Sequence, residues 1–176
     1  MTTAAAERLR TLVRDIPDFP RPGIVFRDIT PLLADGDALR LAVDEMTQPF
    51  RDARIDLVAG IESRGFILGG AVALSLRCGF ATVRKEGRLP HTTMSESYQL
   101  EYGSAVIEVH ADALTQGQRV LVVDDLLATG GTARAAASLV RRLGGVVAGF
   151  SFLIELAPLH GRDALDDAPV SAVLRY

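Results

Sequence analysis

Apolar side chains recur along this chain in two patterns, one with helical spacing and one in short continuous runs. Leu9, Leu12, Val13 and Ile16 lie at helical spacing with charged residues between them, which predicts an amphipathic helix at the start of the chain. Prolines between residues 17 and 31 end this helix and predict an extended, ordered arm. Helical spacing returns at residues 39–46, where a second helix is expected.

Short apolar runs predict strands in the rest of the chain. They cover residues 55–59, 80–83, 119–123 and 146–154, with a turn inside residues 100–109 and an edge strand containing Val170 and Val173. A helix is expected at residues 66–76, and another is expected to end at Gly144. Strands that alternate with helices imply an α/β fold whose central parallel sheet is covered on both faces. Residues 1–176 then form a single domain, with 48% hydrophobic residues available for its core.

The charge balance excludes several classes of partner. A net charge of −3 and a pI near 5.6 argue against broad binding to nucleic acids or anionic membranes, because both need a basic face. The apolar stretch at residues 146–156 is too short to cross a bilayer as a helix. The single cysteine, Cys78, cannot form an internal disulfide and is expected to be a packed core thiol. Residues 7–14 carry charges where a secretory signal would be uncharged, so a cytoplasmic location is expected.

Residues 120–132 are the most informative segment. An apolar run is followed by two acids, by a loop of glycines and hydroxyls, and by a helix. Functional groups in parallel sheets lie just beyond the carboxyl ends of the strands, and Asp124 and Asp125 are expected there. Free amides and the dipole at the start of the helix favour an anion, which predicts a phosphate site. Its candidate residues are Ala128, Thr129, Gly130, Gly131 and Thr132.

Two common nucleotide-binding motifs do not fit this segment. The Walker phosphate loop needs Lys and then Ser or Thr after its last glycine, whereas Thr132 and Ala133 follow Gly131. The glycine spacing does not give the dinucleotide fingerprint G-x-G-x-x-G either. Acids that precede the loop suit a sugar phosphate, because carboxylates accept hydrogen bonds from ribose hydroxyls while the loop holds the 5'-phosphate. The alternative is that the acids only cap the following turn.

Two further polar segments are expected at the same edge of the sheet. Residues 62–65 lie between a strand and a helix and present backbone amides and Arg64, which suits pyrophosphate; a surface ion pair is the alternative for Arg64. Residues 84–103 are long and polar, which suits a mobile lid better than a packed connection, with a solvated charged hairpin as the alternative. His91 in this segment is expected to be exposed to solvent rather than catalytic.

Residues 122–132 (Val-Val-Asp-Asp-Leu-Leu-Ala-Thr-Gly-Gly-Thr) resemble the motif with which type I phosphoribosyltransferases bind 5-phosphoribosyl pyrophosphate (PRPP). The likeness extends over most of the chain, because residues 19–31, 59–65, 83–90 and 98–103 also resemble family segments in the family's order. Phe-Arg-Asp-Ile in the first of these and Leu-Glu-Tyr-Gly in the last point to the adenine branch of the family.

The resemblance implies an α/β fold with a central parallel sheet flanked by helices, a small hood and a flexible lid hairpin. It implies an enzyme of purine salvage, a glycosyltransferase that moves the 5-phosphoribosyl group from PRPP to adenine and releases AMP and pyrophosphate. Positive charge then develops on the ribose, as in other glycosyl transfers. Mg²⁺ is expected to bind with the substrate, with Asp124 and Asp125 as the nearest carboxylates and no dedicated ligand cluster. A homodimer is also implied.

The resemblance assigns roles to individual residues. Glu101 resembles the family's catalytic glutamate, which assists proton movement at adenine N7, although its strand position alone favours an ordinary outward residue. Phe26 is the candidate to stack on adenine, with Val25 and Arg27 offering backbone groups, and plain core is the alternative for Phe26. The residues expected to hold pyrophosphate are Ser63, Arg64, Arg84, Lys85, Arg88 and Tyr102. In the family, the loop that matches residues 62–65 often contains a cis peptide bond.

Two residues depart from the family's pattern, and two other functions compete. The family commonly has Lys at the position of Arg88, and Glu86 adds an acid to a cluster meant for an anion. A regulator that binds PRPP without turning it over is one alternative, but neither charge nor length leaves room for a nucleic-acid surface. An enzyme for hypoxanthine, guanine or xanthine is the other, which the adenine-like segment at residues 26–28 disfavours.

Overall fold

A seven-stranded sheet forms the centre of the part of the chain that the computed structural model describes, residues 3–99, 104–165 and 168–176. Its strand order is β5-β6-β4-β3-β7-β8-β9. The bounds are β3 (Leu57–Ile61), β4 (Gly79–Lys85), β5 (Thr93–Gln99), β6 (Ser104–His110), β7 (Arg119–Leu127), β8 (Val146–Glu155) and β9 (Val170–Arg175). Strands β4, β3, β7, β8 and β9 pair in parallel, whereas β6 is antiparallel to both β4 and β5.

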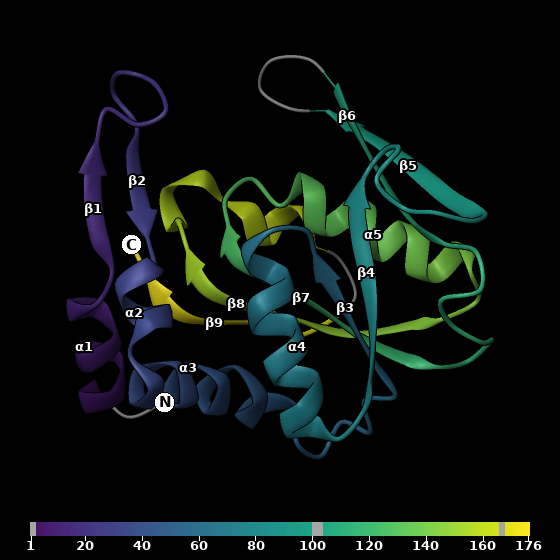
Figure 1. Cartoon of the computed structure of the whole chain (residues 1–176), viewed down its shortest axis with the longest axis horizontal. Helices are drawn as coiled ribbons and strands as arrows, with labels where there is room; N and C mark the ends of the chain where they lie inside the picture. The colour runs from purple at the N-terminus through teal and green to yellow at the C-terminus, as the bar shows by residue number, and fades with distance from the viewer. Residues whose placement is uncertain (1–2, 100–103, 166–167) are drawn as a thin grey trace.

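Helices cover both faces of this sheet (Figure 1). Helix α5 (Gly131–Arg142) packs on one face, while α3 (Gly36–Thr47) and α4 (Arg64–Leu76) pack on the other. Strand β7 shows why its sequence is continuously apolar: Val120 and Val122 belong to the core under α5, and Leu121 and Val123 to the core under α3 and α4. Successive residues of a strand face opposite sides, so a strand buried on both faces needs apolar residues at every position.

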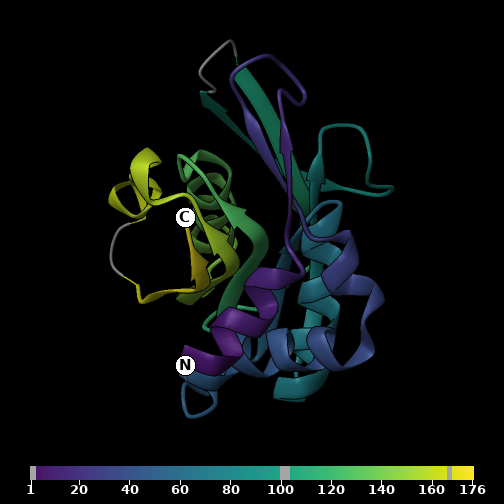
Figure 2. The same cartoon turned by 90° about the vertical axis from the view of Figure 1, so that its left-hand side faces the viewer.

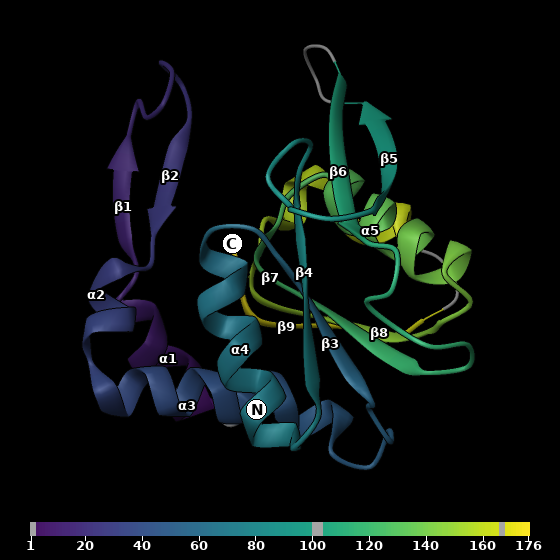
Figure 3. The same ribbon diagram turned by 45° about the vertical axis from the view of Figure 1, so that its right-hand side comes forward.

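Two hairpins project to the same side of the molecule (Figures 1 and 3). One is a separate antiparallel sheet of β1 (Arg14–Pro17) and β2 (Val25–Asp28), carried by α1 (Thr3–Thr11) and α2 (Thr30–Ala34). The other is formed by β5 and β6, which pair along their whole length. The predicted parallel sheet, small hood and lid hairpin are therefore confirmed.

Three short 3₁₀ helices complete the structure described: η1 (Gln48–Phe50), η2 (Ala157–Leu159) and η3 (Gly161–Ala164). The last two lie between β8 and β9, close to the C-terminus, as the view along the edge of the molecule shows (Figure 2). Cys78 is a half-buried free thiol at the margin of the core beneath α4, and burial raises its pKa. Among the residues described, no helix has the length and apolar character needed to span a membrane.

Two expectations from the sequence need correction. The opening helix ends at Thr11, and Ile16 lies instead in β1, because residues 14–17 pair with β2 and this pairing overrides the helical spacing. Strand β7 continues to Leu127, so Asp124 and Asp125 lie inside the paired strand rather than beyond its end. The lid hairpin contains β5 at residues 93–99, and its mobility stays a prediction.

Candidate active site

The sheet has one point where the direction of its connections reverses, between β3 and β7. These two strands are parallel neighbours, but the chain leaves β3 through α4 toward β4 and leaves β7 through α5 toward β8 on the opposite side. Such divergence opens a crevice at the carboxyl ends of the two strands, where ligands of open α/β sheets bind. The sequence singled out two polar loops, residues 62–65 after β3 and residues 128–132 after β7, and both lie at this point.

The second of these loops forms a small cavity at the start of α5. A volume of about 70 Å³ is enclosed by Asp124, Leu126, Leu127, Ala128, Thr129, Gly130, Gly131, Thr132 and Ala133. Gly130 precedes the helix in a left-handed conformation with φ +80°, which L side chains rarely adopt. Among the residues described, no side chain caps the amides at the start of α5, which suits the binding of an anion there. We call residues 128–132 the phosphate loop.

The two aspartates connect this loop to the other one. Arg64 Nε lies 2.5 Å from Asp125 Oδ2, and the backbone amide of Asp125 donates to Asp124 Oδ1 over 2.8 Å. A Cβ atom on Gly65 would stand 2.7 Å from Asp124 Oδ1, so only glycine lets the two loops approach this closely. Burial and the neighbouring charge of Asp125 raise the pKa of Asp124 well above its usual range. The site thus holds two adjacent acids, only one of which is paired with a cation among the contacts described.

The loop at residues 62–65 is strained at Ser63, whose φ of +73° is rare for a residue with a side chain. This conformation lets α4 begin at Arg64 and places the Arg64 guanidinium between Asp125 and the ring of Phe26, 5.0 Å from its centroid. The cis peptide bond that the family resemblance suggested here is absent. Among the described residues, the one cis bond is Phe19-Pro20.

Two of the basic residues predicted to bind pyrophosphate, Arg84 and Lys85, lie beside the carboxylate of Glu62. Glu62 lies 3.6 Å from Arg84 Nε and 3.9 Å from Lys85 Nζ, and it accepts a hydrogen bond from the Lys85 amide over 3.0 Å. Arg84 also donates to the backbone carbonyl of Arg88 over 2.9 Å, while the Arg88 side chain is exposed. The sequence named Glu86 as an acid in this cluster, and the structure adds a second one, Glu62, which contacts Arg84 and Lys85. Its signal was its position directly after strand β3.

The turn that carries Arg88 is held by Glu108. Its buried carboxylate accepts hydrogen bonds from the amides of Arg88 and Leu89 and from the hydroxyl of Thr93. Burial alone would raise the pKa of Glu108, but these hydrogen bonds outweigh it and lower the pKa. The turn between β4 and β5 is therefore anchored from β6.

The proposed adenine residues lie on β2 of the hood. Phe26 is half-buried and packs edge-on against Phe19, with ring centroids 5.2 Å apart. Val25 is 45% exposed, whereas the Arg27 side chain ion-pairs with Asp15 and lies over the ring of the C-terminal Tyr176. The side chain of Arg27 is thus used to dock the hood, a role that needs Tyr176 and that nothing in the local sequence indicated.

The lid hairpin is fastened to the phosphate loop. Thr132 Oγ1 donates to the Tyr98 hydroxyl over 3.1 Å. At the last residue of α5, Arg142 donates to the carbonyl of Ser95 over 2.8 Å and to Glu96 Oε2 over 2.5 Å. Sequence reasoning did not identify Tyr98 as a contact of the loop. The predicted catalytic Glu101 and the predicted pyrophosphate ligand Tyr102 lie outside the described residues.

Comparison with known proteins agrees with this geometry. Residues 33–171 match the family model described as a phosphoribosyl transferase domain. Over 173 residues the chain is 54% identical to the adenine phosphoribosyltransferase of Thermobifida fusca, which covers 98% of each chain. The chain belongs to the adenine phosphoribosyltransferase family. The resemblance drawn from five sequence segments is thereby confirmed.

Solved structures of adenine phosphoribosyltransferases share the whole fold. The crystal structure of the Rhodothermus marinus protein superposes with a TM-score of 0.96 at 53% identity, covering 99% of this chain and 100% of that one. The Saccharomyces cerevisiae protein gives a TM-score of 0.93 at 37% identity and covers 98% and 100%. That structure was determined in complex with an imino-altritol bisphosphate and adenine.

Proposed function

We propose that this protein transfers the 5-phosphoribosyl group from PRPP to adenine, producing AMP and pyrophosphate in purine salvage. One observation carries the proposal: an anion-binding loop, two adjacent acids and a basic loop meet at the point where the sheet reverses its connections. A ribose 5-phosphate ester needs this combination, and its pyrophosphate needs positive charge on the other side of the crevice. Membership of the adenine phosphoribosyltransferase family supports the same choice.

The proposed reaction replaces one bond at the anomeric carbon with another. The bond to the pyrophosphate oxygen breaks and its electron pair leaves with pyrophosphate, while a ring nitrogen of adenine attacks from the opposite face with inversion. Asp124 and Asp125 hold the ribose hydroxyls, and residues 128–132 hold the 5'-phosphate. The negative charge of the two aspartates also stabilises the positive charge that develops on the ribose.

Cations on the facing loops would stabilise the leaving group. Ser63 offers its backbone amide in the strained loop, and Arg64 can move from Asp125 to pyrophosphate. Arg84, Lys85, Arg88 and Tyr102 complete the proposed pyrophosphate site. Because Glu62 neutralises part of this cluster, we expect it to weaken the hold on pyrophosphate and so to favour product release.

The proposed adenine site is formed by the hood and the lid. Phe26 would stack on the purine, with backbone groups of Val25 and Arg27 at its edge. Glu101 would accept or return the proton at adenine N7. The exposed edge of Val25 and the packing of Phe26 on Phe19 support a stacking surface on this hairpin.

Mg²⁺ fits this donor set as a cation that arrives with its substrate. No cluster of three or more His, Cys, Asp or Glu side chains occurs in the part of the chain described, so no closed metal cage is formed there. Asp124 and Asp125 offer the one or two carboxylates with which Mg²⁺ is usually held beside substrate oxygens. The cation supplies charge neutralisation for the diphosphate when bound. The raised pKa of Asp124 marks a carboxylate that a nearby cation would return to its charged form.

A homodimer and a cytoplasmic location complete the proposal. Both rest on the sequence: the family resemblance for the dimer, and the lone Cys78, which cannot form an internal disulfide, for the location. Light scattering should give twice the chain mass of 18.8 kDa.

The test measures pyrophosphate release from PRPP with Mg²⁺, offering adenine, hypoxanthine, guanine and xanthine separately. Turnover with adenine alone is expected. Turnover with another base instead would show that the enzyme is specific for that base. Tight PRPP binding without turnover on any base would indicate a sensor rather than an enzyme. The double variant Asp124→Asn, Asp125→Asn should lower kcat/KM by about a hundredfold or more, because it removes both carboxylates at the ribose. Near-normal turnover of this variant would contradict the site assignment.

A further inference from the structure

The phosphate loop rests on backbone from another part of the chain, the 3₁₀ helix η3. A Cβ atom on Gly130 would stand 2.4 Å from the carbonyl oxygen of Gly161 and 3.0 Å from Ala164. Conversely, a Cβ atom on Gly161 would stand 2.2 Å from the carbonyl oxygen of Ala128 and 2.9 Å from Leu127. The loop and η3 therefore touch through their backbones, with glycine on both sides of the contact.

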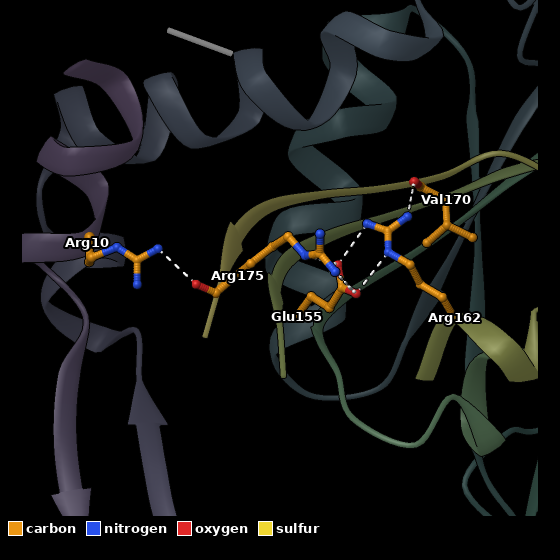
Figure 4. A network of polar contacts seen from close by, with 5 residues as sticks. All are labelled: Arg10, Glu155, Arg162, Val170 and Arg175. Atoms are coloured by element: carbon orange, nitrogen blue, oxygen red, sulfur yellow. Dashed lines mark hydrogen bonds and ion pairs between the residues drawn. The ribbon is translucent and has the colours of Figure 1, made fainter. Parts of the chain in front are cut away.

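An ion-pair network holds η3 in this place (Figure 4). Arg162, the residue after Gly161, donates from Nε and Nη2 to the two oxygens of Glu155 over 2.8 and 2.7 Å. Its third nitrogen, Nη1, donates to the carbonyl of Val170 over 2.6 Å. Arg162 thus ties η3 to the end of β8 and to the start of β9 at once.

Glu155 is the fixed point of the network. Its side chain is 4% exposed, and it stands opposite Leu127 where β7 runs into the phosphate loop. The amide of Leu156 donates to the Leu127 carbonyl over 2.9 Å, which keeps this register. Arg175, 62% exposed, also contacts Glu155 but has no contact with the backbone beneath the loop among those described. Of the two arginines, only Arg162 connects the buried carboxylate to the residue under the loop.

We propose that Arg162 is a positioning residue for the phosphate loop. Clamped by Glu155, it holds the backbone of Gly161 against the loop and so sets the direction of the loop amides. This inference rests on the proposed function in one respect, the binding of a 5'-phosphate by those amides. An oriented amide array loses affinity steeply when its support loosens, because small displacements misalign several hydrogen bonds together. All three guanidinium nitrogens of Arg162 donate to protein acceptors, so in this proposal it acts on the loop through Gly161.

The test compares Arg162→Met with Arg175→Met, which removes a charge from the same carboxylate but leaves η3 tied down. For the full-length protein we would measure kcat, the KM for PRPP and for adenine, and the Kd of ribose 5-phosphate by calorimetry. Arg162→Met should raise the KM for PRPP and the Kd of ribose 5-phosphate about tenfold, with kcat and the KM for adenine within about twofold of wild type. Arg175→Met should leave all four quantities within about twofold.

Arg162→Lys separates positioning from general stability. It keeps the charge beside Glu155 but loses the planar fork that reaches two partners, so it should recover part of the ribose 5-phosphate affinity. If Arg162→Met does not fold, the same four quantities are compared between Arg162→Lys and Arg175→Met. The inference then requires weaker ribose 5-phosphate binding in Arg162→Lys than in Arg175→Met. Wild-type affinity for ribose 5-phosphate in the Arg162 variant would overturn the inference, and so would an equal loss in Arg175→Met. Absence of wild-type turnover with retained ribose 5-phosphate binding would instead contradict the proposed function alone.

Discussion

At the residue scale, Asp124 and Asp125 are neighbours with opposite effects on stability. The folded protein holds the Asp124 proton more tightly than the unfolded chain does, because burial and Asp125 raise its pKa. This cost is absent below about pH 3, where the carboxyl is protonated in both states, and it grows as pH rises from there toward the folded pKa. Asp124→Asn should therefore raise the free energy of unfolding at pH 7 and have its smallest effect near pH 3. Urea denaturation between pH 3 and pH 8 measures this.

Asp125→Asn is the matched control, because it removes a carboxylate paired with Arg64 over 2.5 Å. It should lower the free energy of unfolding at pH 7 by about 1 kcal/mol. Equal effects of the two substitutions would show that the acids are not distinguished by their surroundings. A stabilising Asp124→Asn that also loses activity would fit a site kept charged for its ligand at the expense of the free protein.

At the scale of elements, the hood is docked through the last residue of the chain. Two guanidinium groups lie over the Tyr176 ring, that of Arg10 at 4.4 Å and that of Arg27 at 4.1 Å from the ring centroid, and Arg27 belongs to β2. Each such contact contributes about 0.5–2 kcal/mol. Tyr176→Ala should therefore speed hydrogen exchange of the β1 and β2 amides and raise the KM for adenine several-fold. Tyr176→Phe keeps the ring and should behave like wild type; protection that is unchanged in Tyr176→Ala would show that other contacts dock the hood.

At the scale of the whole molecule, PRPP should tie together the loops that follow β3 and β7. A ligand that binds only the folded state at a hundred times its Kd adds about 2.7 kcal/mol to stability, which is about 5–10 °C in Tm for a chain of this size. We expect this shift for PRPP with Mg²⁺ in differential scanning calorimetry. Chelation of Mg²⁺ by EDTA should reduce it, and adenine alone should give a much smaller one, since its proposed site lies on the hood. Equal shifts with and without EDTA would argue against a metal that binds with the substrate.

Much of this protein followed from short segments of sequence. The parallel sheet, the helix predicted at residues 66–76 and observed at 64–76, and the loop before α5 were predictable because each depends on patterns within about a dozen residues. The first helix was predicted to extend too far along the chain. Ile16 fits the apolar stripe of a helix, but in the fold it lies in β1 and pairs with Phe26 in β2. The contact of Glu62 with the basic cluster was not predicted, because Glu62 and Lys85 are distant in sequence and meet only through the pairing of β3 with β4.

The sequence by itself determined the class of site, since a phosphate loop needs only glycines, hydroxyls and a helix start that follow one another along the chain. The tertiary structure alone decided which distant groups complete it. Arg64 meets Asp125 across 61 positions, and Gly161 supports Ala128 because β8 and β9 bring η3 beneath the loop. The physical reason is that strand order and register, which arise from the burial of both sheet faces, set these contacts, and spacing along the chain does not encode them.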